Sequence, residues 1–249
     1  MKKTIIALSV LAVSITPAQA EYLYGFSNIS ANYLDWSDGT SDRASHLQNF
    51  SYIELEGGAG FTWGELYGFA DLEIPDKNSS EVRTSIKGAI DVKTGLAGLN
   101  AYGQLYNTNS SGFTAQNSVL GLSYKFSGDW GFVKPWAGLH HSITTASWMD
   151  PAGFSGLNGG MAGITAVYNF GVFEQSFTLT TWNEVEFART DDYTMVSGET
   201  DELSLNGAAA IWWNATNHLT TGIQYRYSHN KLGNSGYSNA LIYSVKYNF

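Results

Sequence analysis

The last nine residues, LIYSVKYNF (241–249), alternate between two kinds of side chain. Every second residue from Leu241 to Phe249 is apolar or aromatic, whereas Lys246 and Asn248 lie between them. A period of two predicts a β-strand with two different faces. An apolar face that continues to a terminal aromatic is typical of an outer-membrane barrel, whose outer wall meets lipid. The alternative is an edge strand of a soluble β-sandwich.

The first twenty residues have the pattern of a secretory signal peptide. A basic start at Lys2 and Lys3 is followed by an apolar stretch at 5–15 and by small residues up to Ala20. We therefore expect 1–20 to be removed on export and 21–249 to form one domain. The rest of the sequence has no apolar run of the ~18 residues that a helical span needs. A membrane location would then require a closed barrel, because a barrel satisfies its backbone hydrogen bonds internally.

The composition supports the same class. Charged residues make up 14% and aromatic residues also 14%, with 27 glycines, which suits a barrel with one lipid face and one wet face. The chain has 0 cysteines, so disulfides and thiolate metal sites are excluded. A net charge of -9 argues against a nucleic-acid partner. We expect no cofactor.

Alternating segments recur along the chain and predict an antiparallel β-barrel of about twelve strands. The predicted strands are 22–34, 50–60, 65–73, 82–93, 97–107, 116–127, 131–144, 159–170, 173–187, 200–213, 218–229 and 238–249. The predicted short connections are 61–64, 94–96, 127–130, 171–172 and 214–217, and the longer ones are 35–49, 74–81, 108–115, 145–158, 188–199 and 230–237. Short turns would face the periplasm with both termini, and long loops would face outward.

The period also assigns side chains to the two faces of the wall. A charge on the lipid face costs about 2–4 kcal/mol near the bilayer centre, so the acids and bases of these strands should point inward. A shift by one residue would place them all in lipid, which fixes the register. The predicted lumen residues of most interest are Tyr52, Glu54, Glu56, Tyr67, Phe69, Asp71, Arg83, Lys87, Tyr102, Trp182, Glu184 and Arg226.

This lumen set mixes carboxylates, cations and aromatic rings. Ring faces stack on heterocycles and sugars, and nearby polar groups can bond hydroxyls and ring nitrogens. The set therefore suits nucleosides or sugars better than bare ions, and we take it as the candidate substrate-binding set. The alternative is structural: inward acid–base pairs brace a small barrel without any ligand.

Two stretches resemble a known family. Residues 52–56 (YIELE) and 61–71 (FTWGELYGFAD) resemble the conserved block of the nucleoside-specific Tsx channels, and more closely its OmpK branch. Residues 83–91 and the terminal Tyr-Asn-Phe lie where that family has similar segments. The resemblance implies a twelve-stranded monomeric barrel with a narrow pore, weak nucleoside sites along it, and loops that could serve as bacteriophage or colicin receptors. The matched lumen residues are Tyr52, Glu54, Glu56, Tyr67, Phe69 and Asp71, with Lys87 about where the family has a basic residue.

A lipid-modifying enzyme is the main rival class. His140, His141 and Ser142 are adjacent, and in a strand His140 and Ser142 share one face while His141 has the other. The backbones of His140 and Ser142 would lie about 6–7 Å apart, and Ser142 lacks a Gly-x-Ser-x-Gly context. We therefore expect no enzyme and no catalytic residues, and interpret this stretch as a polar strand end near the outer rim.

A second acidic stretch could be interpreted as a cation site. Glu184, Glu186, Asp191 and Asp192 carry the oxygen ligands that divalent cations prefer, but their spacing fits no loop motif. We expect a solvated rim there and no metal.

The sequence as a whole predicts a passive channel of the bacterial outer membrane that is selective for nucleosides or similar small hydrophilic solutes. The expected partners are outer-membrane lipid and lipopolysaccharide, the solutes, and bacteriophage or colicin at the loops. The alternatives are a general small-solute porin of the same fold and an adhesion barrel whose loops carry the function.

Overall fold

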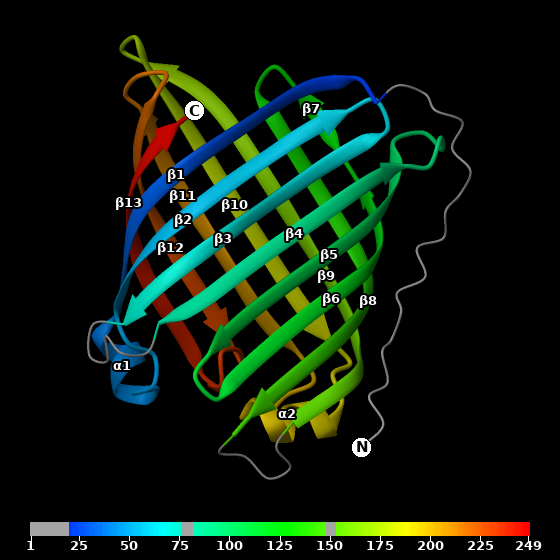
Figure 1. Cartoon of the computed structure of the whole chain (residues 1–249), viewed down its shortest axis with the longest axis vertical. Coiled ribbons are helices and arrows are strands. Elements are labelled where there is room, and N and C mark those ends of the chain that lie inside the picture. Colours follow the sequence, from blue (N-terminus) through cyan, green and yellow to red (C-terminus); the bar gives the residue numbers. More distant parts are fainter. Residues whose placement is uncertain (1–19, 76–81, 148–152) are drawn as a thin grey trace.

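Antiparallel pairing between strands that are consecutive in sequence builds the structure (Figure 1). The computed structural model describes residues 20–75, 82–147 and 153–249. The predicted signal peptide therefore lies almost entirely outside the described residues. Neither of the helices in the described part of the chain is long and apolar enough to cross a membrane.

The strands are longer than the sequence predicted at many ends. They are β1 (Tyr22–Trp36), β2 (Phe50–Phe61), β3 (Gly64–Pro75), β4 (Arg83–Lys93), β5 (Leu99–Ser110), β6 (Phe113–Tyr124), β7 (Phe126–Gly128), β8 (Gly131–Ala146), β9 (Gly153–Val172), β10 (Gln175–Phe187), β11 (Ser204–Asn214), β12 (Leu219–His229) and β13 (Tyr237–Asn248). Two short helices, α1 (Asp38–Arg43) and α2 (Asp191–Ser197), lie in connections.

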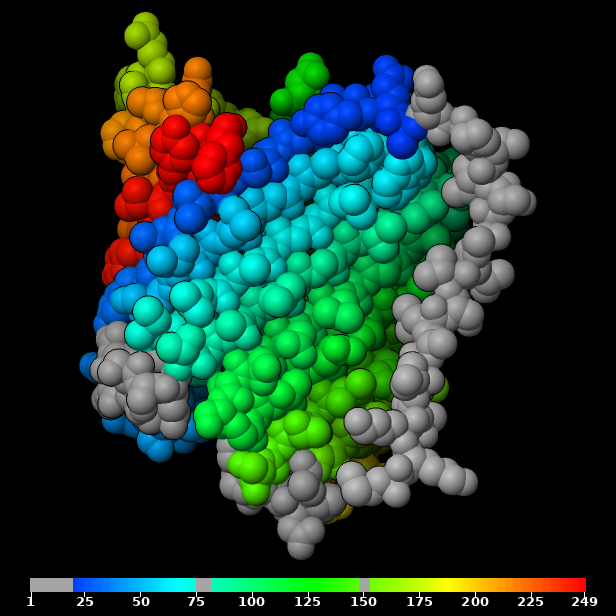
Figure 2. Space-filling view, in the orientation of Figure 1, coloured from blue at the N-terminus to red at the C-terminus, as the bar shows by residue number. Residues whose placement is uncertain are grey.

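The sheet closes on itself. Strand β6 pairs with β8, and the short β7 continues β6 along the same neighbour beyond Lys125. The 13 segments therefore form a wall of 12 strands, which confirms the predicted all-β barrel and its strand number. Figure 2 shows β1 to β6 packed side by side into a continuous outer surface.

The first and last strands meet along a seam. Asn28 of β1 lies opposite Asn248 of β13, and the Phe249 amide donates to the Ser27 carbonyl at 3.1 Å. At the other end of the seam the Ser37 hydroxyl donates to Asn239 Oδ1 at 2.9 Å, across 202 residues of sequence. Every strand of the wall thus has a partner on both sides, so no long edge is left.

The two faces of each strand divide as the alternation predicted. In β13, Leu241, Tyr243 and Val245 are exposed on the outer surface, whereas Ala240 and Ile242 are buried inside. The same division separates two adjacent residues of β11, since Trp212 is 9% exposed and Trp213 is 42% exposed. The outer surface is apolar and the inner one largely polar, as a lipid-facing barrel requires.

The short turns lie at one end of the barrel, which we call the turn end, and α1 and α2 lie at the other, which we call the loop end (Figure 1). The predicted turn at 171–172 is wrong, because β9 continues to Val172 and the chain reverses at Phe173 and Glu174. Both residues have positive φ angles, 49° and 61°, as a two-residue hairpin turn of the mirror-image type requires. Without glycine or asparagine there, the sequence carried no signal for it.

Two of the predicted long loops are also wrong. Between β5 and β6 the chain reverses at Ser111 and Gly112, so 108–115 is mostly strand. Strands β8 and β9 extend into 145–158, and the remaining connection lies largely outside the described residues. At the loop end the long described connections are therefore those at 37–49, 188–203 and 230–236.

Candidate functional site

The inner face of β2 and β3 carries the residues on which the family resemblance rests. Tyr67 and Phe69 make an edge-to-face contact with ring centroids 6.5 Å apart, and the Tyr67 hydroxyl donates to Glu56 at 2.8 Å. Glu54 lies directly opposite Asp71 on the neighbouring strand. All twelve residues proposed from sequence lie on the inner faces of their strands. They are Tyr52, Glu54, Glu56, Tyr67, Phe69, Asp71, Arg83, Lys87, Tyr102, Trp182, Glu184 and Arg226.

One ion pair crosses the lumen. Lys87 Nζ of β4 lies 2.7 Å from Glu184 Oε1 of β10, although four strands separate β4 from β10 around the wall. Gln104 of β5 donates to the same carboxylate at 3.3 Å. The wall is therefore bridged between distant strands, and the free cross-section at this level is narrowed by side chains.

Two cations lie near the ring of Trp182. Lys87 Nζ is 5.8 Å from the Trp182 ring centroid, and Arg226 Cζ is 5.7 Å from it. A cation over an indole face is attracted by the electron density of the ring. Lys87 also forms an ion pair with Glu184. Arg226 comes from β12, which is two strands away from β10. The arrangement combines a flat ring with a positive charge, that of Arg226, which forms no ion pair among the described residues.

The charged candidates divide into paired and unpaired groups. Arg83 lies 3.0 Å from Glu73, and Glu56 lies 3.0 Å from Lys246. Among the residues that the structure describes, no ion pair involves the following three candidates: Glu54, Asp71 and Arg226. They lie within electrostatic range of one another and of the Tyr52 ring. These three side chains therefore take no part in the ion pairs that brace the described wall.

Tyr102 differs from the other aromatic candidates. It is 3% exposed, stacks on Trp136 with centroids 5.0 Å apart, and donates through its hydroxyl to Gln104 at 2.6 Å. Both its ring and its hydroxyl are therefore occupied by the protein. It faces inward as expected, but its geometry is that of a packed interior residue.

The sequence reasoning missed several inner residues. Trp212 lies under Lys246, whose Nζ is 4.2 Å from the ring centroid, and Trp212 Nε1 donates to Thr180 at 2.9 Å. Lys134 pairs with Asp91 at 2.6 Å. The alternation in the last strand already predicted that Lys246 faces inward. Alternation does not predict which neighbouring strand a long side chain such as Lys246 contacts.

The His140 stretch is buried. His140 and Ser142 share the inner face, as predicted from the period, and both are 0% exposed. His140 Nε2 is 2.9 Å from Asn117 Oδ1, and in the described residues Ser142 Oγ has no hydrogen-bond partner. The pair thus lacks the nucleophile–base contact that an acyl-transfer site uses.

The acidic stretch at 184–192 is also only partly a solvated rim. Glu184 is bound to Lys87 in the lumen, and Glu186 is 2% exposed and pairs with Lys231 and Arg189. The loop end of β10 is covered at Glu186 because the connection after it folds inward. No group of three metal-ligating side chains is found among residues 20–75, 82–147 and 153–249.

Comparison with known proteins places this lumen in a family. Residues 31–249 match the family described as nucleoside-specific channel-forming protein, Tsx. Among solved structures the fold resembles the NanC porin, with a TM-score of 0.54, 10% sequence identity, and coverage of 88% of this chain and 98% of that one. The KdgM porin aligns with a TM-score of 0.45 and 7% identity, over 91% of this chain and 99% of that one.

The family match and the likeness to the NanC porin agree with the barrel fold. The chain is an outer-membrane channel for small solutes. Because the family match extends over most of the sequence, the protein belongs to the family of nucleoside-specific channel-forming proteins, Tsx.

Proposed function

We propose that this channel passes nucleosides selectively and passively, and that Glu54, Asp71 and Arg226 bind them beside Tyr52 and Trp182. The observation that carries the proposal is the absence of ion-pair partners for these three charges in the described lumen, where the other charged candidates are paired. A nucleoside offers a flat base for stacking and several hydroxyl and ring-nitrogen groups for hydrogen bonds.

The chemistry of each part follows from its position. The exposed portion of the Trp182 ring provides a stacking surface, and Arg226 can donate hydrogen bonds to base carbonyls or ring nitrogens. The carboxyls of Glu54 and Asp71 can accept hydrogen bonds from ribose hydroxyls. Each contact must be weak, because a channel conducts only if the solute leaves its sites as readily as it binds.

The remaining expectations belong to the same proposal. The turn end faces the periplasm, the loop end faces outward, and residues 1–20 are removed on export. The barrel acts as a monomer in contact with lipid and lipopolysaccharide, performs no catalysis, and uses no metal or cofactor. Its outer loops are available to bacteriophage or colicin.

Single-channel conductance of the purified, refolded protein tests the proposal, with adenosine or thymidine titrated into a planar bilayer. A saturable reduction of the current supports a nucleoside site, and its midpoint gives the affinity. A channel that conducts but ignores nucleosides would support the general-porin alternative. A folded barrel without current would support an adhesion, receptor or lipid-modifying role.

The unpaired charges provide the specific version of this experiment. Arg226→Gln should weaken the block by nucleosides while the channel remains conductive, because it removes a lumen charge that braces no carboxylate. The matched control is Arg43→Gln, which changes an arginine of α1 at the loop end that bonds the Tyr237 carbonyl. Equal block in both variants would contradict the assignment.

A further inference from the structure

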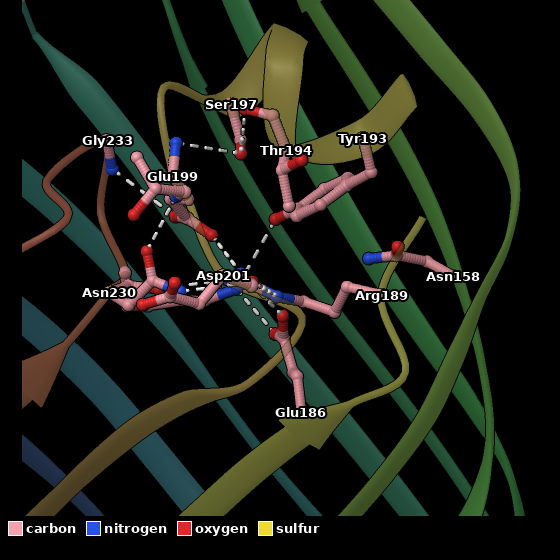
Figure 3. Close-up of polar contacts among 12 residues, drawn as sticks. Asn158, Glu186, Arg189, Tyr193, Thr194, Ser197, Glu199, Asp201, Asn230 and Gly233 are labelled. Carbon is pink, nitrogen blue, oxygen red and sulfur yellow. Dashed lines mark hydrogen bonds and ion pairs between the residues drawn. The ribbon is translucent and has the colours of Figure 1, made fainter. Parts of the chain in front are cut away.

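The connection from β10 to β11 folds over the inner wall at the loop end. We call residues 188–203, which include α2, the lid (Figure 3). Its Tyr193 is 4% exposed and meets Phe154 of β9 edge-on, with centroids 5.6 Å apart. The Thr190 amide donates to Asn158 Oδ1 of β9 at 3.0 Å. The lid therefore leans across the neighbouring strand instead of extending away from the barrel.

A buried ion cluster holds the lid. Arg189 has a fully buried side chain and pairs with Glu199 of the lid and with Glu186 at the end of β10 (Figure 3). Lys231, from the last long connection, pairs with the same Glu186. We call Glu186, Arg189, Glu199 and Lys231 the clamp. Buried charges stay in place only while they are paired, so the clamp acts as a unit.

The connection at 230–236 ties the lid to the rest of the loop end. Asn230 Oδ1 accepts from the Thr200 amide at 2.8 Å, and its Nδ2 donates to the Leu203 carbonyl at 2.8 Å. The Leu232 carbonyl in turn lies 2.9 Å from His46 Nε2 of the first long connection. The connection at 230–236 therefore links the connection at 37–49 to the lid.

The wall beneath the lid is polar and poorly satisfied. His140, Ser142 and Asn158 are each 0% exposed. In the described residues His140 Nδ1, Ser142 Oγ and Asn158 Nδ2 have no hydrogen-bond partner. Buried polar groups in a permanently closed structure are almost always bonded. Closure of the lid over these groups therefore carries a penalty that opening removes.

Backbone strain is concentrated at the same place. Ala188, the first residue of the lid, has a φ of 53°, which an L-residue with a side chain adopts at a cost. Opposite it, Gly159 has a φ of 68°, and a Cβ there would lie 2.2 Å from the Ala188 carbonyl oxygen. The lid therefore starts at a strained hinge whose conformation the closed position enforces.

We propose that the lid is a movable gate of the channel, held closed by the clamp and opposed by the unsatisfied polar wall and the strained hinge. When the clamp breaks, the lid swings from β9, the wall is hydrated and the loop-end mouth widens. The proposal rests on the channel function of the barrel. Because it concerns the passage of salt ions, it can fail while nucleoside selectivity holds, and the reverse is also possible.

A disulfide across the gate tests this. The chain has 0 cysteines, and an ideal Cβ on Gly198 lies 4.0 Å from Gly233 Cα, so these two residues are neighbours across the gate. Single-channel recordings in potassium chloride would compare the Gly198→Cys/Gly233→Cys variant before and after addition of a reductant. We expect the oxidised channel to stay in its low-conductance state and the reduced one to switch to a higher state. Identical dwell times would overturn the proposal.

Two controls keep the result interpretable. Each single cysteine variant places a side chain at one of the two positive φ angles, 73° at Gly198 or 69° at Gly233, without a crosslink. Reductant should therefore leave its current unchanged. Arg189→Gln breaks the clamp without any crosslink and should raise the fraction of time in the higher state at least several-fold. Heat-modified mobility on a gel verifies that each barrel is folded. A folded Arg189→Gln channel with unchanged switching would also overturn the proposal.

Discussion

The middle of the lumen and the loop-end clamp are built from the same residue types, yet they differ in how those residues are used. In the clamp, Arg189 has two carboxylate partners and is fully buried. In the middle of the lumen, Arg226 lies over Trp182 and, among described residues, pairs with no carboxylate. Paired charges hold a structure together, whereas unpaired charges at a wet wall remain available to a passing solute.

Removing the clamp arginine should give the largest effect. Arg189→Ala leaves the buried carboxylate of Glu199 without its ion-pair partner, which typically costs about 3–5 kcal/mol. We expect a fall of this size in the free energy of unfolding, measured by urea titration of the refolded barrel. Arg226→Ala should cost far less, since it breaks no ion pair. Equal losses for both variants would remove the distinction between the two regions.

Trp182 should give the next largest effect, on solute binding instead of stability. Stacking on an aromatic side chain is worth about 1–3 kcal/mol per base, so Trp182→Ala should weaken nucleoside block by about fivefold or more. The matched control is Trp213→Ala, which removes an indole from the outer surface. A titration of block against nucleoside concentration measures both. If the two variants bind alike, stacking on Trp182 is not part of the mechanism.

Substitution of a charged lumen residue should change the selectivity between cations and anions by a smaller amount. Glu54→Gln removes an acid without an ion-pair partner and should make the channel less selective for cations. In a water-filled lumen, the difference in free energy between the passage of cations and of anions should change by less than about 1 kcal/mol. Arg226→Gln should shift selectivity in the opposite direction. The reversal potential in a salt gradient reports both changes. Shifts of the same sign would mean that these residues do not face the ion path together.

Acid should have the smallest effect on the lid, and in the closing direction. Burial raises the pKa of Glu199, although Lys231 and Arg189 act against this. Glu199 taken alone therefore binds a proton more tightly in the closed form than in the open form, and its titration favours closure as pH falls. Burial opposes the charge of Lys231, but Glu186, Tyr193 and Glu199 raise its pKa well above the ordinary value, so its contribution is lost only in strong alkali.

Recordings at about pH 7 and about pH 5 check this sign. Unchanged or longer dwell times in the low-conductance state are expected at the lower pH. A gate that opens in acid would mean that protonation of Glu199 breaks its pairing with Arg189 before it relieves the cost of burial.

The alternation of residues was sufficient to predict the wall, because each polar or charged side chain on the lipid face would cost free energy. It placed Tyr52, Asp71 and Arg226 on the inner face without knowledge of any contact. It could not predict the turn at Phe173–Glu174, where conformation is set by the strands on either side. Nor could it predict the clamp, since Glu186 and Lys231 are 45 residues apart and meet only after the barrel closes.

The seam between β1 and β13 also has a kinetic consequence. The Ser37–Asn239 bond joins residues 202 positions apart, whereas the other strand pairs join neighbours in the chain. Hairpins can therefore form one after another, but ring closure waits for the whole sheet and carries the largest loss of chain entropy. Until then both border strands present unpaired backbone groups that invite association with other chains. Closure of the β1–β13 seam therefore competes, during assembly, with pairing of the open β1 or β13 edge with another chain.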